Sequence, residues 1–178
     1  MIKTVCMAFA YGSPPSLPIN KNLALRAATV CKSRSGIPLY TQNEVALAGV
    51  METDFLRHDV EMYVLGEDQP YVSTLWLARK LKGTLQEQGY DIKTIQVVVV
   101  AAPMHWPRCL RDLKKVGFTM VQENSQIYHG LVNYFDRRST QFWTRYKFLC
   151  HLRETILLNL PWKWYEKITL SENIAGKL

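Results

Sequence analysis

The chain has 178 residues, of which 48% are hydrophobic and 21% charged, a balance typical of one folded domain and not of a disordered chain. Its 22 basic and 15 acidic residues give a net charge of +7, which favours anionic partners such as nucleotides, phosphorylated sugars, nucleic acid or acidic lipid. No basic run is dense enough for a nucleic-acid-binding arm, so nucleic acid ranks last among these partners.

Short apolar runs that end at a glycine, a proline or a polar turn predict buried strands of a parallel sheet. Five such runs occur, at 5–10, 38–41, 61–65, 95–102 and 118–121. The fourth run contains four consecutive valines at 97–100, and β-branched residues in a row suit a central strand and suit a helix poorly.

Segments with helical periodicity follow these runs. They are predicted from Asn20 or Asn22 to near Gly36, from 42 to 56, from Pro70 to Gly89 and from Pro107 to Gly117. A last helix breaks at Pro161 and carries apolar side chains on one face: Phe142, Tyr146, Leu149, Leu152, Ile156 and Leu160. Because strand and helix alternate, we expect an α/β, three-layer Rossmann-like fold with a mostly parallel five-stranded sheet and helices on both faces.

We expect a single domain over 1–178, with the sheet core at 1–122 and a link and C-terminal helical extension at 123–178. The extension contains an aromatic and basic run, WKWY at 162–165, which either rests on a membrane surface or packs back onto the sheet; we favour packing. The apolar N-terminal stretch is interpreted as a strand and not as a signal peptide. No run of 18 apolar residues predicts a transmembrane helix.

The cysteines and glycines carry no chemical signature. The four cysteines show no CxxC spacing, so we expect reduced thiols and a cytoplasmic location: Cys6, Cys31, Cys109 and Cys150. No metal is expected, because the histidines have no ligand spacing to one another. GxGxxG, GKS/GKT and GxSxG motifs are absent, so the sequence has no dinucleotide fingerprint, P-loop or nucleophile elbow.

In an open parallel sheet, ligands bind beyond the carboxyl ends of the strands. The polar residues at these positions are Tyr11, Gly12 and Ser13 after the first strand, Gln42, Asn43 and Glu44 after the second, Glu67, Asp68 and Gln69 after the third, and His105 and Arg108 after the fourth. The paired carboxylates of Glu67 and Asp68 fit a metal or acid–base site, and fit a solvated loop or a helix cap better.

The fourth set is the most informative, because a buried strand there leads directly into a helix whose first amides and dipole favour an anion. Arg108, one turn into this helix, has the geometry for a bidentate contact to phosphate or carboxylate, or for a surface salt bridge. His105 is an acid–base candidate because its ordinary pKa lies near neutrality. The alternative for His105 is a satisfied side chain that caps the helix.

The stretch VVVVAAPMHWPR at 97–108, followed by Leu110 and Gly117, resembles the motif of the SanA/YdcF/ElyC family, in which a strand runs into a Thr-Ser-x-x-His-x-x-Arg turn and a helix. The resemblance covers residues 4–160 and includes, in the same order, further positions of the family: the turn at 11–13, Arg26, Glu67, Thr74, and the Arg153–Glu154 pair. The chain departs from the family where Ala101 and Ala102 replace Thr-Ser, where Pro70 replaces a serine, where Trp76 or Leu77 replaces an asparagine and where Tyr11 replaces a glycine.

The resemblance implies a Rossmann-like fold, a pocket bounded by these turns and a link to bacterial envelope biogenesis. For the YdcF-like soluble branch it also implies a nucleotide-like ligand such as S-adenosylmethionine. The family has no firmly assigned reaction, and the hydroxyl and amide groups missing here would change or remove its ligand.

Two hypotheses follow. In the first, the chain binds an anionic or nucleotide-like small molecule and acts as a transferase or hydrolase, with His105 as acid–base group and Glu67 orienting it or accepting a sugar hydroxyl. The ligand-binding residues are then Tyr11, Gly12, Ser13, Arg26, Asn43, Glu44, Thr74 and Arg108. A pocket filled by Trp76 and Trp106 would contradict this hypothesis. In the second, a non-catalytic interaction protein, peripheral to the inner membrane, docks a partner or an acidic membrane through its basic, Trp-rich C-terminal segment.

Overall fold

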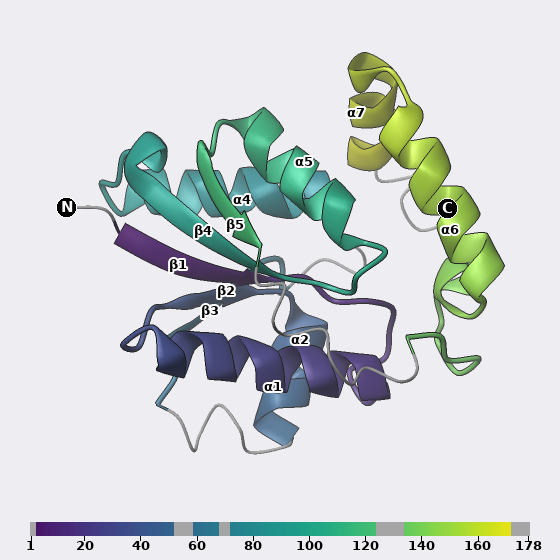
Figure 1. Cartoon of the computed structure of the whole chain (residues 1–178), viewed down its shortest axis with the longest axis horizontal. Helices are drawn as coiled ribbons and strands as arrows, with labels where there is room; N and C mark the ends of the chain where they lie inside the picture. Colours follow the sequence, from purple (N-terminus) through teal and green to yellow (C-terminus); the bar gives the residue numbers. More distant parts are fainter. Residues whose placement is uncertain (1–2, 52–58, 68–71, 124–133, 172–178) are drawn as a thin grey trace.

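The computed structural model describes residues 3–51, 59–67, 72–123 and 134–171 (Figure 1). Its sheet has the strand order β3-β2-β1-β4-β5 and every neighbouring pair is parallel. The strands are β1 (Lys3–Ala8), β2 (Leu39–Thr41), β3 (Met62–Val64), β4 (Ile95–Val100) and β5 (Met120–Glu123). The α-helices are α1 (Pro18–Ser33), α2 (Asn43–Met51), α4 (Thr74–Glu87), α5 (Trp106–Val116), α6 (Lys147–Asn159) and α7 (Trp162–Leu170).

The alternation of side chains along each strand divides the core into two halves. Val98 and Val100 of β4 pack on the side of α1 and α2, whereas Val97 and Val99 pack on the side of α4 and α5. Figure 1 shows these two helix pairs on opposite faces of the sheet. The four valines are fully or almost fully buried because β4 lies between β1 and β5, as the apolar run predicts. The predicted α/β class with a parallel sheet covered on both faces is confirmed.

The order in which the chain adds strands to the sheet reverses between β1 and β4. From β1 it proceeds outward to β2 and β3, and it then returns to β4, which pairs with the other side of β1. The connections that leave the carboxyl ends of β1 and β4 therefore diverge to opposite faces, and this divergence opens a crevice where ligands bind in open α/β sheets. The fold places the turn after Ala8 and the turn before α5 on the two sides of this crevice.

The C-terminal region differs from its prediction. The last predicted helix begins only at Lys147, since Phe142 lies in a 3₁₀ turn, η3 (Phe142–Thr144), and Tyr146 is the N-cap of α6. The run at 162–165 is not a tail on the sheet: it opens a further helix, α7, whose Tyr165 is fully buried against Leu75 of α4 and Leu157 of α6. Pro161 has no backbone N–H with which to continue α6, and it occupies the N-cap position of α7.

The predicted apolar face of the last helix is also wrong in its direction. The buried residues of α6 are Cys150, Glu154 and Leu157, while Leu152 and Ile156 are exposed. An ionic contact of Glu154, described below, determines which side of the helix faces the body. No described helix is at once long and apolar enough to cross a membrane.

Candidate functional site

A cavity of about 40 Å³ lies at the carboxyl edge of the sheet, beside the reversal between β1 and β4. Its walls come from the turn after β1, the first turns of α2, α4 and α5, the η3 turn and the inner face of α6. The lining side chains that carry polar chemistry are Tyr11, Gln42, Glu44, Thr74, His105, Arg108, Gln141, Thr144, Cys150, Arg153 and Glu154.

The turn after β1 is shaped by a buried asparagine. Asn20 accepts from the amide of Tyr11 at 3.0 Å and donates from Nδ2 to the carbonyl oxygens of Gly12 at 3.0 Å and Pro14 at 3.2 Å. Gly12 has a φ of +83°, and a Cβ there would lie 2.7 Å from Oγ of Ser139. Glycine at this position therefore lets the segment that contains η3 close over the turn and complete the cavity wall.

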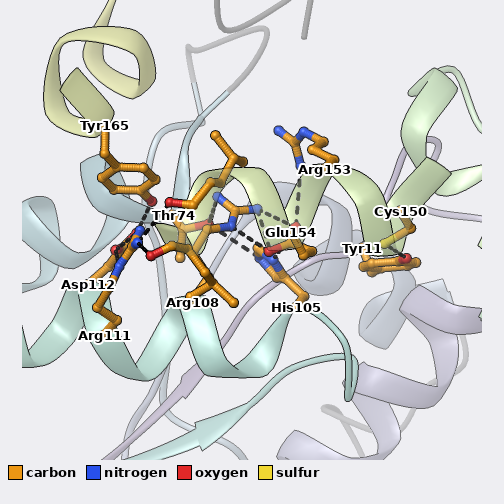
Figure 2. Close-up of polar contacts among 12 residues, drawn as sticks. Tyr11, Thr74, His105, Arg108, Arg111, Asp112, Cys150, Arg153, Glu154 and Tyr165 are labelled. Carbon is orange, nitrogen blue, oxygen red and sulfur yellow. Dashed lines mark hydrogen bonds and ion pairs between the residues drawn. The ribbon is translucent and has the colours of Figure 1, made fainter. Parts of the chain in front are cut away.

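Arg108 is the centre of a buried hydrogen-bonded network (Figure 2). Its Nε donates to Oε2 of Glu154 at 2.7 Å and its Nη2 donates to Oε1 of Glu154 at 2.9 Å. Nη1 donates to Oγ1 of Thr74 at 2.9 Å, and Nη2 also donates to Nδ1 of His105 at 2.9 Å. Each of the three guanidinium nitrogens thus donates to protein atoms, so Arg108 holds α4, α5 and α6 together around the cavity.

The network also determines the protonation of His105. Nδ1 of His105 lies 2.9 Å from Nη2 of Arg108 and 3.4 Å from Oε1 of Glu154. Because a guanidinium can only donate, we assign Nδ1 as the acceptor and the ring proton to Nε2, 3.3 Å from Oγ1 of Thr74. Burial and the charge of Arg108 lower the pKa of His105, although Glu154 opposes them. His105 is therefore neutral near pH 7, and its Nε2 has no lone pair with which to deprotonate Thr74.

The carboxylate beside His105 is ionised. Burial disfavours the charge of Glu154, but the guanidinium of Arg108 outweighs this effect and holds the pKa of Glu154 well below its usual range. The opposite wall stays neutral: burial raises the pKa values of Tyr11 and Cys150, and Oη of Tyr11 lies 2.6 Å from Sγ of Cys150.

Positive potential reaches the cavity from two sources. Arg153, whose side chain is 16% exposed, lines the cavity, and its Nη1 lies 3.5 Å from Oε1 of Glu154. The first turns of α2, α4 and α5 bring Glu44, Thr74 and His105 to the wall, so three helix dipoles present their positive ends there. Burial raises the pKa of Glu44, which makes its negative charge easier to neutralise.

The structure brings six of the ten predicted site residues to the cavity: Tyr11, Gly12, Glu44, Thr74, His105 and Arg108. Ser13, Arg26 and Asn43 do not line it, and the carbonyl of Ser13 instead accepts from the amide of Thr140 at 2.7 Å. Glu67 is exposed and does not line it either. β3, the strand before Glu67, is separated from β4 by two strands, and the carboxylate beside His105 is Glu154. Asp68 and Gln69 lie outside the described residues.

Trp76 and Trp106 do not line the cavity. Both pack against the core cluster on the α4 and α5 side of the sheet, and a Cβ at Gly66 would lie 3.0 Å from the ring of Trp76. The two tryptophans therefore do not fill the site.

The site residues that the sequence analysis did not assign come mainly from the C-terminal region, above all Arg153 and Glu154. A signal for Glu154 exists in the sequence, because it lies four residues after Cys150 and three before Leu157, in an otherwise apolar stripe. Gln42 follows β2, and its Oε1 accepts from the amide of Ala10 at 2.7 Å, which ties the ends of β1 and β2 together.

No family model, curated protein or solved structure matches this chain. The resemblance to the SanA/YdcF/ElyC family therefore stays a prediction. Among the described residues, no group of three or more His, Cys, Asp and Glu side chains is placed to hold a metal ion.

Proposed function

We propose that this chain is a Rossmann-like small-molecule-binding protein whose cavity receives the anionic group of an acidic or nucleotide-like ligand. The proposal rests on one observation: hydrogen-bond donors, arginines and three helix N-termini converge on one cavity at the reversal of strand order. The order β3-β2-β1-β4-β5 is also the one expected for the Rossmann-like class.

The size of the cavity limits what enters it. A volume of about 40 Å³ corresponds to roughly three water-sized groups. This space is the size of a carboxylate or a phosphate and smaller than a nucleoside. A ligand such as S-adenosylmethionine would therefore place its carboxylate in this space.

Arg153 is the proposed anion contact, and Arg108 is the proposed positioning residue. The donors of Arg108 are committed to Glu154, Thr74 and His105, and a ligand would have to break these bonds to displace them. Arg153 lines the cavity wall beside this network, and its Nη1 lies 3.5 Å from Oε1 of Glu154. The hydroxyl of Thr74 accepts from Arg108, so its own proton is available to a ligand oxygen in the cavity.

We favour binding over hydrolase or transferase chemistry in this arrangement. Glu154, His105 and Thr74 stand in the order of a catalytic triad, but the tautomer of His105 is the wrong one for a general base. Catalysis would require Arg108 to leave Nδ1 of His105. The connection to envelope biogenesis rests on the family resemblance alone.

The test is thermal stability against a panel of S-adenosylmethionine, nucleotides and phosphorylated sugars. A ligand at about 100 times its dissociation constant adds roughly 2.7 kcal/mol to the free energy of unfolding. We expect one ligand to stabilise the wild type and Arg138→Gln, and not Arg153→Gln. Arg138 is the matched control, because it is exposed and its loss changes the net charge equally.

Two outcomes would contradict the proposal. If no compound shifts the wild type, the cavity is not an anion site for these ligand classes. If a ligand stabilises Arg153→Gln as much as the wild type, it binds elsewhere.

A further inference from the structure

Large apolar side chains gather on the outside of the C-terminal region. Six of the ten exposed large hydrophobic residues among the described residues lie between 142 and 164: Phe142, Tyr146, Phe148, Leu152, Ile156 and Trp164. Phe148, Leu152 and Ile156 recur every four residues, so they form one ridge along α6, which we call the α6 ridge. Their exposed fractions are 73%, 43% and 51%.

The α6 ridge cannot turn inward, because the other side of the helix is anchored to the body. Glu154 is buried in its bidentate contact with Arg108, and Nη1 of Arg111 donates to the carbonyl oxygens of Leu157 at 2.9 Å and Leu158 at 3.2 Å. Rotation of α6 would break a buried ion pair and leave a charge without its partner. Figure 1 shows α6 at the margin of the molecule, away from the sheet.

The surroundings of the ridge are basic. Lys147 is exposed directly before Phe148, and exposed Arg137 lies over the ring of Tyr146 at 5.8 Å. The three carboxylates between 134 and 170 all form ion pairs within the protein: Asp136 with Arg138, Glu154 with Arg108, and Glu166 with Arg79. Seven basic residues occupy the same stretch, so the exposed surface there has an excess of positive charge.

We propose that the α6 ridge lies on a membrane surface that contains anionic lipid. Phe148, Leu152 and Ile156 would enter the boundary between headgroups and acyl chains, and the neighbouring Lys147 and Arg137 would contact lipid phosphates. An amphipathic helix with a bulky apolar face and basic flanks binds anionic bilayers by this combination of burial and electrostatic attraction. A second copy of the chain is a poorer occupant, because pairing two ridges would bring like charges together. This inference does not depend on the ligand in the cavity.

The experiment is sedimentation of the full chain with vesicles of phosphatidylcholine alone and of phosphatidylcholine mixed with phosphatidylglycerol. We expect binding to the mixed vesicles, weakened by added salt, and little binding to phosphatidylcholine alone. The triple variant Phe148→Gln, Leu152→Gln, Ile156→Gln should bind the mixed vesicles at least about tenfold more weakly than the wild type. Its melting temperature should stay unchanged, because these side chains are exposed.

The matched control is Leu25→Gln, Leu47→Gln, Val50→Gln, which removes three comparably exposed apolar side chains from α1 and α2. The control should bind vesicles like the wild type. Three results would overturn the proposal: no binding of the wild type to mixed vesicles, equal binding of the ridge variant and the wild type, or equal loss in ridge variant and control. A dimer that the ridge variant alone converts to monomer, without vesicle binding, would assign the ridge to a second copy.

Discussion

The Arg108–Glu154 pair offers the most direct test of the site, because both side chains are almost fully buried, at 2% and 4% exposure. Glu154→Ala removes both acceptors of the bidentate contact and leaves the guanidinium charge in the interior. Breaking a buried pair in this way costs about 3–5 kcal/mol. For a chain of this length, such a loss lowers the melting temperature by about 6–20 °C.

Replacement of both partners should cost less than removal of one. In Arg108→Met, Glu154→Met no charge remains buried, so we expect a large part of the loss to be recovered. The control is Glu166→Ala, which breaks the more exposed Arg79–Glu166 pair and should cost less than about 1 kcal/mol. The assay is urea unfolding at pH 7 for the wild type and the three variants. If Glu154→Ala costs no more than Glu166→Ala, or if the double variant is the least stable, the network does not hold the site together as described.

Two further predictions use the same unfolding assay. The pKa of His105 in the folded protein lies below its ordinary value of about 6.5, so the unfolded chain binds the proton first. The free energy of unfolding should therefore fall as the pH drops below about 6.5, and His105→Asn should lose this part of the pH dependence. An unchanged profile in His105→Asn would show that His105 is not the titrating group. Gly12→Ala should lower the stability more than Gly36→Ala. Both glycines have a positive φ, but only at Gly12 does the new Cβ meet side chains, those of Ser139 at 2.7 Å and Thr144 at 2.8 Å. Equal losses in the two variants would mean that the segment carrying Ser139 and Thr144 moves away from the new Cβ at no cost in free energy.

Local patterns in the sequence are sufficient for the strands and for six of the ten predicted site residues. The four valines at 97–100 predict a central strand because β-branched, fully apolar runs have few other places in a fold, and β4 is that strand. The turn that follows carries His105 and Arg108 to the carboxyl edge by connectivity alone, since a strand that ends there must deliver its next residues there.

The partners of these residues depend on distances that local sequence does not contain. Glu67 follows a strand as His105 does, but β3 is at the edge of the sheet, and strand order is decided by packing of the whole chain. Glu154 lies 46 residues after Arg108, on a helix whose apolar periodicity indicates the opposite face. One buried ion pair overrides that periodicity, because an unpaired Arg108 inside the domain would cost more than exposure of Leu152 and Ile156.

The Arg108–Glu154 ion pair therefore fixes which side of α6 faces the cavity and which side faces outward. Its inner side supplies Cys150, Arg153 and Glu154 to the cavity, and its outer side presents the α6 ridge. A core helix with this sequence would bury its leucine and isoleucine stripe and leave its charged residues in water, as amphipathic helices ordinarily do. We expect the inverted arrangement to depend on the contact of Arg108 with Glu154. The proposed ligand binding at the cavity and the proposed membrane binding at the ridge therefore share one structural support. Substitution of Arg153 or of the ridge should affect one function each, whereas substitution of Glu154 should affect both.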